Sequence, residues 1–218
     1  GMSFPEEYGG SDANAEATVC VSSKLAEAWP SLQLPWSVTT TLVGFPIMTF
    51  GREDQKKRSL SLMASREVPG SFGATETEVG SDLSALKMSA EYQNGKYILN
   101  GTKNLITSAD YARFMVLFAR IKGWTEDFPK RHAGITAFLI ESNEPGFKDI
   151  PGIKIKLIDK RGFHGAPFYQ VDFKDVIIPE DSILGTRGKG MQVALATLDM
   201  GRFGIASQGD GIARRALS

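Results

Sequence analysis

The feature that most constrains the fold is a change of pattern in the middle of the chain. Between about Val68 and Pro179, runs of β-branched and aromatic residues recur between glycines, asparagines and prolines, which is typical of short strands joined by turns. The segments on either side lack this pattern and are rich in helix-forming residues. The sequence therefore predicts an α+β protein in which a barrel or sandwich of strands lies between helices.

An Asn-Gly pair gives the strongest local signal inside this block. Asn94-Gly95 separates two runs of strand-forming residues, and Asn-Gly readily takes the positive φ angles of a type I′ turn. We therefore expect the residues on either side to form a β-hairpin. Further strands are expected at residues 113–121, 134–141 and 169–176.

Helices are expected before the block. Residues 11–65 are rich in alanine, leucine, serine and methionine, and prolines divide them into short segments. The first helix should begin with a cap at Ser11 or Asp12. Pro35 suits the first turn of a second helix, and a third should begin near Gly51.

A last helix is expected from about residue 186 to the end of the chain. The apolar residues that recur at helical spacing, and so should share a face, are Met191, Ala194, Leu195, Leu198 and Phe203. Four glycines in the same segment weaken a helix by about 1 kcal/mol each relative to alanine. We therefore expect this helix either to pack closely against a neighbouring element or to be weakly ordered where that partner is missing.

The composition limits the classes of function. The chain carries 25 basic and 25 acidic residues, so its net charge is zero, which argues against a protein that coats nucleic acid or an anionic membrane. Its 218 residues fit about one and a half domains. Cys20 is its one cysteine, and no apolar run approaches the ~18 residues of a membrane span. We expect a soluble protein of a reducing compartment, the cytoplasm or, in a eukaryote, the mitochondrial matrix.

No metal site is expected. The two histidines, His132 and His164, are far apart in the sequence. Neither has a cysteine or carboxylate at the spacing that zinc sites use.

The loop of residues 73–82, GATETEVGSD, carries the most chemical information. Its glycines expose main-chain N–H groups that can approach a phosphate or a flavin closely, and its side chains add hydroxyls and carboxylates. On its own, such a stretch is more typical of a polar loop that leaves a strand. Five other stretches accompany it along the chain: PEEYGG, GREDQKK, NGTKNLIT, FKDVIIPEDSILG and LDMGRFGIASQ.

With these six stretches in this order, the chain resembles the acyl-CoA dehydrogenase family from Phe4 to Ser218. The last stretch is most similar to the short-chain branch. The resemblance implies a helical N-terminal domain, a central antiparallel β-barrel and a C-terminal four-helix domain, assembled as a homotetramer around FAD. Residues 1–67 would be the remainder of the first domain, residues 68–185 the barrel, and residues 186–218 a single helix of the third. The chain is therefore expected to be a fragment, from which FAD can be absent.

The resemblance also implies which residues contact the flavin. In the first segment, the Thr75 hydroxyl would hydrogen-bond the isoalloxazine, and Ser81 would lie near the pyrophosphate. In the second, the Thr107 hydroxyl would lie near the hydride-accepting nitrogen, and Leu105 replaces a tryptophan that many members carry as an apolar wall. The implied cofactor-binding residues are Phe72, Ala74, Thr75, Ser81, Leu105, Ile106 and Thr107.

Three residues are implied to contact the substrate: Ser81, Asp199 and Arg202. The family chemistry needs a carboxylate base that removes the α-proton while the β-hydride passes to the flavin. Some branches place this glutamate immediately before the arginine, where this chain has Gly201. The base is therefore expected to lie beyond Ser218.

Two carboxylates of the GATETEVGSD loop, Glu76 and Glu78, could replace the missing base by residue type. In the family, however, this loop faces the flavin rather than the α-carbon, and a base must reach the proton that it abstracts. Neither is expected to act as the base. No residue of this chain is expected to be catalytic, and the isolated chain should not turn over.

The predicted function is that of an FAD-dependent acyl-CoA dehydrogenase, which forms a trans-2,3-enoyl-CoA from an acyl-CoA and passes electrons to an electron-transfer flavoprotein. One alternative is a flavin-dependent acyl-CoA oxidase or monooxygenase of the same fold. Another is a non-catalytic β-barrel module that binds CoA esters. None of these functions requires nucleic acid or a membrane span.

Overall fold

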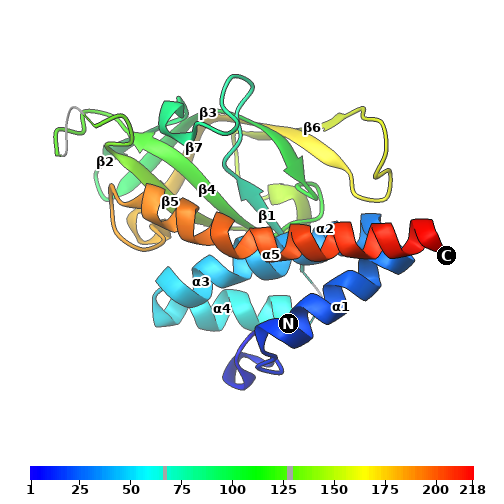
Figure 1. Cartoon of the computed structure of the whole chain (residues 1–218). Coiled ribbons are helices and arrows are strands. Elements are labelled where there is room, and N and C mark those ends of the chain that lie inside the picture. Colours follow the sequence, from blue (N-terminus) through cyan, green and yellow to red (C-terminus); the bar gives the residue numbers. More distant parts are fainter. Residues whose placement is uncertain (66–67, 127–129) are drawn as a thin grey trace.

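A computed structural model describes residues 1–65, 68–126 and 130–218 of the chain. Helices from both ends of the chain pack against a curled sheet formed by its middle part (Figure 1). The predicted α+β class, with helices before and after the strands, is confirmed. Residues 66–67 lie outside the described residues, and the first expected domain boundary falls at this point, between residues 67 and 68. The division into three parts stays a prediction.

Short helices form the N-terminal part. They are α1 (Ala15–Ala28), α2 (Pro30–Ser37), the π-helical η2 (Val38–Gly44), α3 (Phe45–Phe50) and α4 (Glu53–Ala64). Single 3-10 turns occur at η1 (Glu6–Tyr8), η3 (Leu83–Ala85), η4 (Pro145–Phe147) and η5 (Glu180–Ser182).

Two expectations for the starts of these helices were wrong. The side chain of Asn14 accepts the main-chain N–H of Ala17 at 2.9 Å and caps α1, because it stands directly before the first helical residue, whereas Ser11 and Asp12 are too early in the chain. Pro30, rather than Pro35, occupies the first turn of α2.

The strands form one mixed sheet among the described residues. They are β1 (Gly70–Gly73), β2 (Ser89–Gln93), β3 (Lys96–Thr107), β4 (Phe114–Ile121), β5 (Ile135–Glu141), β6 (Ile153–Ile158) and β7 (Phe168–Pro179). Their order is β1-β4-β2-β3-β7-β6, and β5 pairs with β4. The expected wholly antiparallel arrangement needs correction, because β1 and β2 both pair with β4 in parallel. Since β3 carries the chain back before β4 begins, β4 runs in the same direction as β2.

The predicted hairpin is confirmed. Asn94 and Gly95 have φ angles of 50° and 76°, and Gln93 pairs with Lys96 on either side of the turn. These two residues therefore reverse the chain as a type I′ turn requires.

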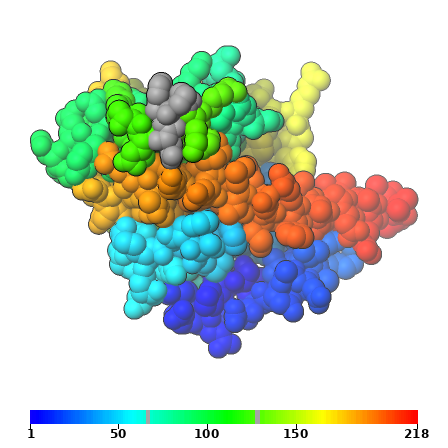
Figure 2. Space-filling view, turned by 60° about the vertical axis from the view of Figure 1, so that its left-hand side comes forward, coloured from blue at the N-terminus to red at the C-terminus, as the bar shows by residue number. Residues whose placement is uncertain are grey.

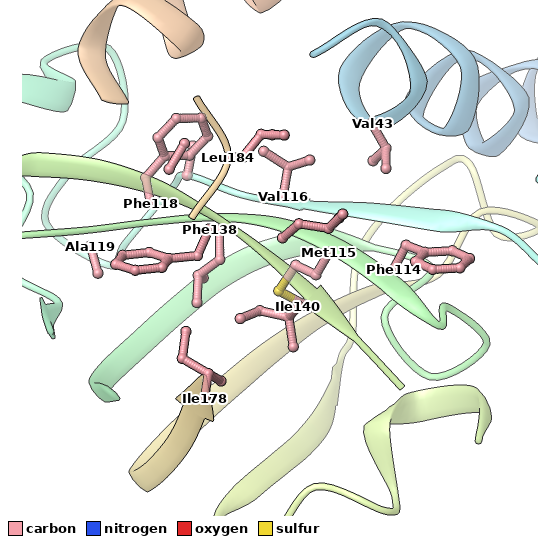
Figure 3. Close-up of a cluster of buried hydrophobic side chains, with 14 of the residues drawn as sticks. Val43, Phe114, Met115, Val116, Phe118, Ala119, Phe138, Ile140, Ile178 and Leu184 are labelled. Carbon is pink, nitrogen blue, oxygen red and sulfur yellow. The ribbon is translucent and has the colours of Figure 1, made fainter. Parts of the chain in front are cut away.

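The hydrophobic core is centred on β4 and β5, which are buried along almost their whole length. Figure 3 shows side chains of both strands packed with residues from the neighbouring elements, among them Val43 of η2. A Cβ atom at Gly70 would lie 2.8 Å from Val43 Cγ1, so η2 approaches β1 too closely for a side chain there. This contact brings η2 against the sheet.

Helix α5 (Gly190–Leu217) runs between the sheet and the N-terminal helices, and its C-terminal end projects beyond them (Figures 1 and 2). Apart from Val193, its buried residues are small or polar: Gly190, Ala194, Thr197, Gly204, Ser207, Gln208 and Gly211. The expected apolar face is therefore partly wrong, because Leu195 and Phe203 are exposed. The expected close packing is confirmed, since a Cβ at Gly211 would lie 2.2 Å from the Ser23 carbonyl oxygen of α1.

A buried group of polar side chains, which we call the polar seam, joins α5 to α1 and α2. It consists of Ser22, Gln33, Ser207 and Gln208. The Oγ atoms of Ser207 and Ser22 lie 2.6 Å apart, and Gln33 Nε2 donates to Ser22 Oγ at 2.8 Å. Gln208 Nε2 donates to Gln33 Oε1, so each member of the seam has a partner within it.

None of the helices in the described ranges is both long and apolar enough to cross a membrane.

Candidate active site

A cavity of ≈ 540 Å³ lies where the end of β3 and the loop after β1 approach η2 and α5. Its lining residues are Val38, Leu42, Phe72, Ala74, Thr75, Gly80, Ser81, Leu83, Leu105, Thr107 and Leu198. Six of the predicted site residues are among them: Phe72, Ala74, Thr75, Ser81, Leu105 and Thr107. The structure thus brings together residues from two separate stretches of the sequence.

Three predicted site residues do not line this cavity. Ile106 is almost fully buried and belongs to the hydrophobic core. Asp199 and Arg202 are exposed on α5 and form an ion pair with each other. The residue of this helix that reaches the cavity is their neighbour Leu198.

The loop after β1 is tied to β3 by a buried lysine. Lys103 Nζ lies 3.1 Å from the carbonyl oxygen of Ala74 and 3.0 Å from Glu76 Oε1, and the Lys103 side chain is 0% exposed. The main-chain N–H of Asn104 donates to the Thr75 carbonyl at 2.9 Å. These contacts hold the two cavity-lining segments side by side.

Glu76 is not available as a base. Its carboxylate accepts the main-chain N–H groups of Lys87 and Met88 at 2.8 and 2.9 Å, in addition to the Lys103 ammonium. Burial alone would raise the pKa of the Glu76 carboxyl, but these donors outweigh burial and hold that pKa below its ordinary value. Burial lowers the pKa of Lys103 to about 8. The pair is therefore charged at neutral pH, is buried, and does not line the cavity.

The end of β3 departs from regular strand geometry at the cavity. Its pairing with β7 shifts register between Lys103 and Ile106, and Leu105 between them has a φ of 58°, which is unusual for a residue other than glycine. The Leu105 side chain is 51% exposed and lines the cavity. Strained backbone of this kind is concentrated at functional sites.

The lining of the cavity is amphipathic. Thr75, Ser81 and Thr107 bring hydroxyls, whereas most of the other side chains are apolar. Among the described residues that line the cavity, none has a side chain that exchanges a proton near neutral pH. The cavity can therefore bind a ligand that is partly polar and partly apolar, but the described residues of its lining supply no acid or base.

The sequence reasoning missed several residues of this site. Val38 and Leu42 are four residues apart, so they share one face of η2, a pattern that could have indicated a second apolar wall. Lys103 lies an even number of residues after the buried Tyr97 and Leu99 of β3. Since side chains alternate between the two faces of a strand, this spacing could have indicated a buried ammonium.

Within residues 1–65, 68–126 and 130–218, no three histidine, cysteine, aspartate or glutamate side chains come close enough to hold a metal ion.

Fold and cavity together define an α+β protein in which a curled sheet and flanking helices enclose an amphipathic cavity. Residues 1–67 match the N-terminal domain of the acyl-CoA dehydrogenases, and residues 71–176 match their middle domain. The chain belongs to the acyl-CoA dehydrogenase family.

Individual relatives agree with this assignment. The human mitochondrial short-chain specific acyl-CoA dehydrogenase is 37% identical over 99% of this chain and 50% of its own length. The structure of butyryl-CoA dehydrogenase from Megasphaera elsdenii matches 100% of this chain and 55% of its own, with a TM-score of 0.90 and 35% identity. An acyl-CoA dehydrogenase from Bacillus anthracis, described as complexed with FAD, matches 99% of this chain and 35% of its own, with a TM-score of 0.88 and 28% identity. The chain spans about half the length of the curated relatives that it matches.

The cavity fits the flavin that occurs in this family. Hydroxyls of Thr75 and Thr107 can hydrogen-bond the polar edge of an isoalloxazine, and Phe72 and Leu105 offer apolar surface to its rings. Among the lining residues that the structure describes, none carries a buried, unpaired charge that would oppose a neutral ring system.

Proposed function

We propose that this chain forms the flavin-facing part of an acyl-CoA dehydrogenase that converts an acyl-CoA thioester into a trans-2,3-enoyl-CoA. In that reaction a proton leaves the α-carbon and a hydride leaves the β-carbon. The observation that carries the proposal is the convergence of Phe72–Ser81 and Leu105–Thr107, distant in sequence, on one amphipathic cavity. Family membership and similarity to short-chain enzymes support the same reaction.

The residues of the chain would bind and orient rather than react. The hydroxyls of Thr75 and Thr107 would fix the polar edge of the flavin, which supplies the acceptor for the hydride. Ser81, at the exposed end of the cavity, would contact the CoA arm. Val38 and Leu198 would pack against the acyl chain and exclude water from the reacting carbons.

The catalytic base is proposed to come from a part of the enzyme outside this sequence. The part of the chain that the structure describes places no carboxylate in the lining of the cavity, and Gly201 cannot act as a base because it has no side chain. Since a positioned base contributes about 10²–10⁴-fold to the rate, we expect the isolated chain to bind its ligands without measurable turnover.

The proposal includes the partners that the family resemblance implies: acyl-CoA as substrate, FAD as cofactor, an electron-transfer flavoprotein as acceptor, and a homotetramer as the assembly. Asp199 and Arg202 would contact substrate only if their exposed ion pair opens or reorients. Their role is therefore the part of the site that depends most on the rest of the enzyme.

One observation favours a second candidate function, a non-catalytic module that binds CoA esters. This is the same lack of titratable side chains among the described residues that line the cavity. The two functions differ in whether the chain recognises flavin, so flavin binding separates them.

The test is a titration of the purified chain with FAD, followed by quenching of flavin fluorescence. We expect saturable binding that Thr75→Val and Thr107→Val weaken. Thr49→Val is the matched control, because Thr49 is exposed on α3 and does not line the cavity. Binding of an acyl-CoA without any binding of FAD would instead support the non-catalytic module.

A second measurement addresses turnover. The chain alone should not reduce an artificial electron acceptor with butyryl-CoA, whereas a protein extended to the full length of its relatives should. If the extended protein reacts with oxygen rather than with the acceptor, the oxidase or monooxygenase alternative holds.

A further inference from the structure

Thr75 is held on both sides by one buried ammonium group. Lys103 Nζ contacts the carbonyl oxygen of the residue before it, Ala74, and the carboxylate of the residue after it, Glu76. The carbonyl of Thr75 itself accepts the N–H of Asn104, the residue that follows Lys103. Two consecutive residues of β3 therefore fix three consecutive residues of the cavity wall.

The carboxylate extends this arrangement to a third segment. Glu76 also accepts the N–H groups of Lys87 and Met88, which directly precede β2. The loop after β1, the end of β3 and the approach to β2 thus meet at one ion pair, whose side chains are 0% and 7% exposed.

We propose that the Lys103–Glu76 pair is a positioning pair, which holds Thr75 and the left-handed Leu105 where the cavity can bind the isoalloxazine of a flavin. The identity of the ligand rests on the proposed function. Neither residue of the pair lines the cavity, so both act through the backbone of the residues that do.

Stability alone is a poor reason for this pair. Removing two charges from water costs so much that an apolar pair of similar volume is often as stable as a buried ion pair, or more stable. What an apolar pair cannot do is hold one carbonyl and two N–H groups at fixed points, as Lys103 and Glu76 do. Contacts of that kind specify position, and the unfavourable φ of Leu105, two residues after Lys103, persists only where its surroundings over-determine it.

The experiment compares four variants of the chain with the wild type: Lys103→Met, Glu76→Gln, the double variant, and Lys122→Met as control. Lys122 also pairs with a glutamate, Glu91, but at the exposed surface. Three quantities are measured for each: amide hydrogen exchange without ligand, the thermal midpoint, and the dissociation constant for FAD.

In both single variants we expect exchange at residues 74–76 and 104–107 to rise by roughly tenfold more than at residues 114–121 of β4. In the same two variants, the affinity for FAD should fall. In the double variant the thermal midpoint should return toward that of the wild type, because no unpaired charge remains, while local exchange and FAD affinity stay impaired. Lys122→Met should change none of the three.

Two results would overturn the proposal. One is a double variant that recovers slow exchange and FAD affinity together with the midpoint. The other is exchange that rises equally in β4, which would mean that the pair only stabilises the core. If Lys103→Met fails to fold, Glu76→Gln decides alone, since glutamine keeps an acceptor for the N–H groups. If the wild type does not bind FAD, the proposed function fails for this chain, and the exchange pattern still decides whether the pair positions the loop.

Discussion

The side-chain hydroxyl of Ser71 donates to the main-chain carbonyl of Thr107 at 2.9 Å. Both residues are buried, and the bond joins β1 to the last residue of β3. The two strands that carry the cavity-lining segments are therefore linked on the core side as well as through Lys103.

Replacing Ser71 with alanine should destabilise the chain by about 1–2 kcal/mol, because a buried carbonyl loses its partner. The free energy of unfolding in urea measures this. Ser61→Ala, at an exposed position of α4, is the control and should change stability by no more than about 0.5 kcal/mol. Equal effects of the two substitutions would show that the Ser71 bond contributes nothing.

The left-handed backbone of Leu105 makes a second prediction. Leu105→Val should destabilise the chain by about 1–3 kcal/mol although the side chain is half exposed, because a β-branched residue is strongly disfavoured at positive φ. Leu157→Val, at an exposed position of β6 without positive φ, should stay within about 0.5 kcal/mol of the wild type. Thermal unfolding of both variants provides the comparison, and similar midpoints would contradict the strain at Leu105.

Two glycines of α5 should respond in opposite directions to alanine. Gly211→Ala should destabilise by about 1–3 kcal/mol, because the new Cβ would lie 2.2 Å from the Ser23 carbonyl oxygen. Gly209→Ala meets no atom within 4 Å and should stabilise by about 0.5–1 kcal/mol, since alanine favours the helix. Urea unfolding of the two variants tests whether the close contact between α5 and α1 exists in solution. If both substitutions stabilise the chain, the contact is contradicted.

The pH dependence of stability should report the state of Glu76. In the folded state, the pKa of the Glu76 carboxyl lies below its ordinary value of 4.5. Burial raises this pKa, but the Lys103 ammonium and the main-chain N–H groups of Lys87 and Met88 lower it by more. The carboxylate therefore stabilises the folded state fully above its unfolded pKa, and this stabilisation is lost as the pH falls through the folded pKa. The difference in free energy of unfolding between wild type and Glu76→Gln should narrow on acidification below pH 4.5. Urea midpoints measured over that range check this, and parallel curves would contradict it.

Local chemistry made parts of the fold predictable. The Asn94-Gly95 turn needs only two residues with positive φ, and both adopt it. In the strand Phe114–Ile121, residues 114–119 are an uninterrupted apolar run, which fits their burial on both sides of the sheet. The family stretches made the cavity predictable to the extent that six of the implied residues line it.

What could not be predicted depends on contacts between distant segments. Close approach of α1 determines which face of α5 is buried. Small residues such as Gly211 therefore lie on the buried face, whereas Leu195 and Phe203 are exposed. Likewise, nothing near Lys103 in sequence indicates that its partner is Glu76, which belongs to another segment. Parallel pairing of β1 with β4 also depends on the path of the whole chain.

The polar seam has a consequence for the cavity that it does not touch. Hydroxyls and amides pair only at one rotation and one height of α5 relative to α1 and α2, whereas an apolar interface would tolerate a small slide. Leu198 belongs to the same helix and lines the cavity, so side chains such as Gln33 in the N-terminal helices contribute to the position of this part of the cavity wall. A substitution in the polar seam is therefore expected to change the width of the cavity, although no residue of the seam lines it.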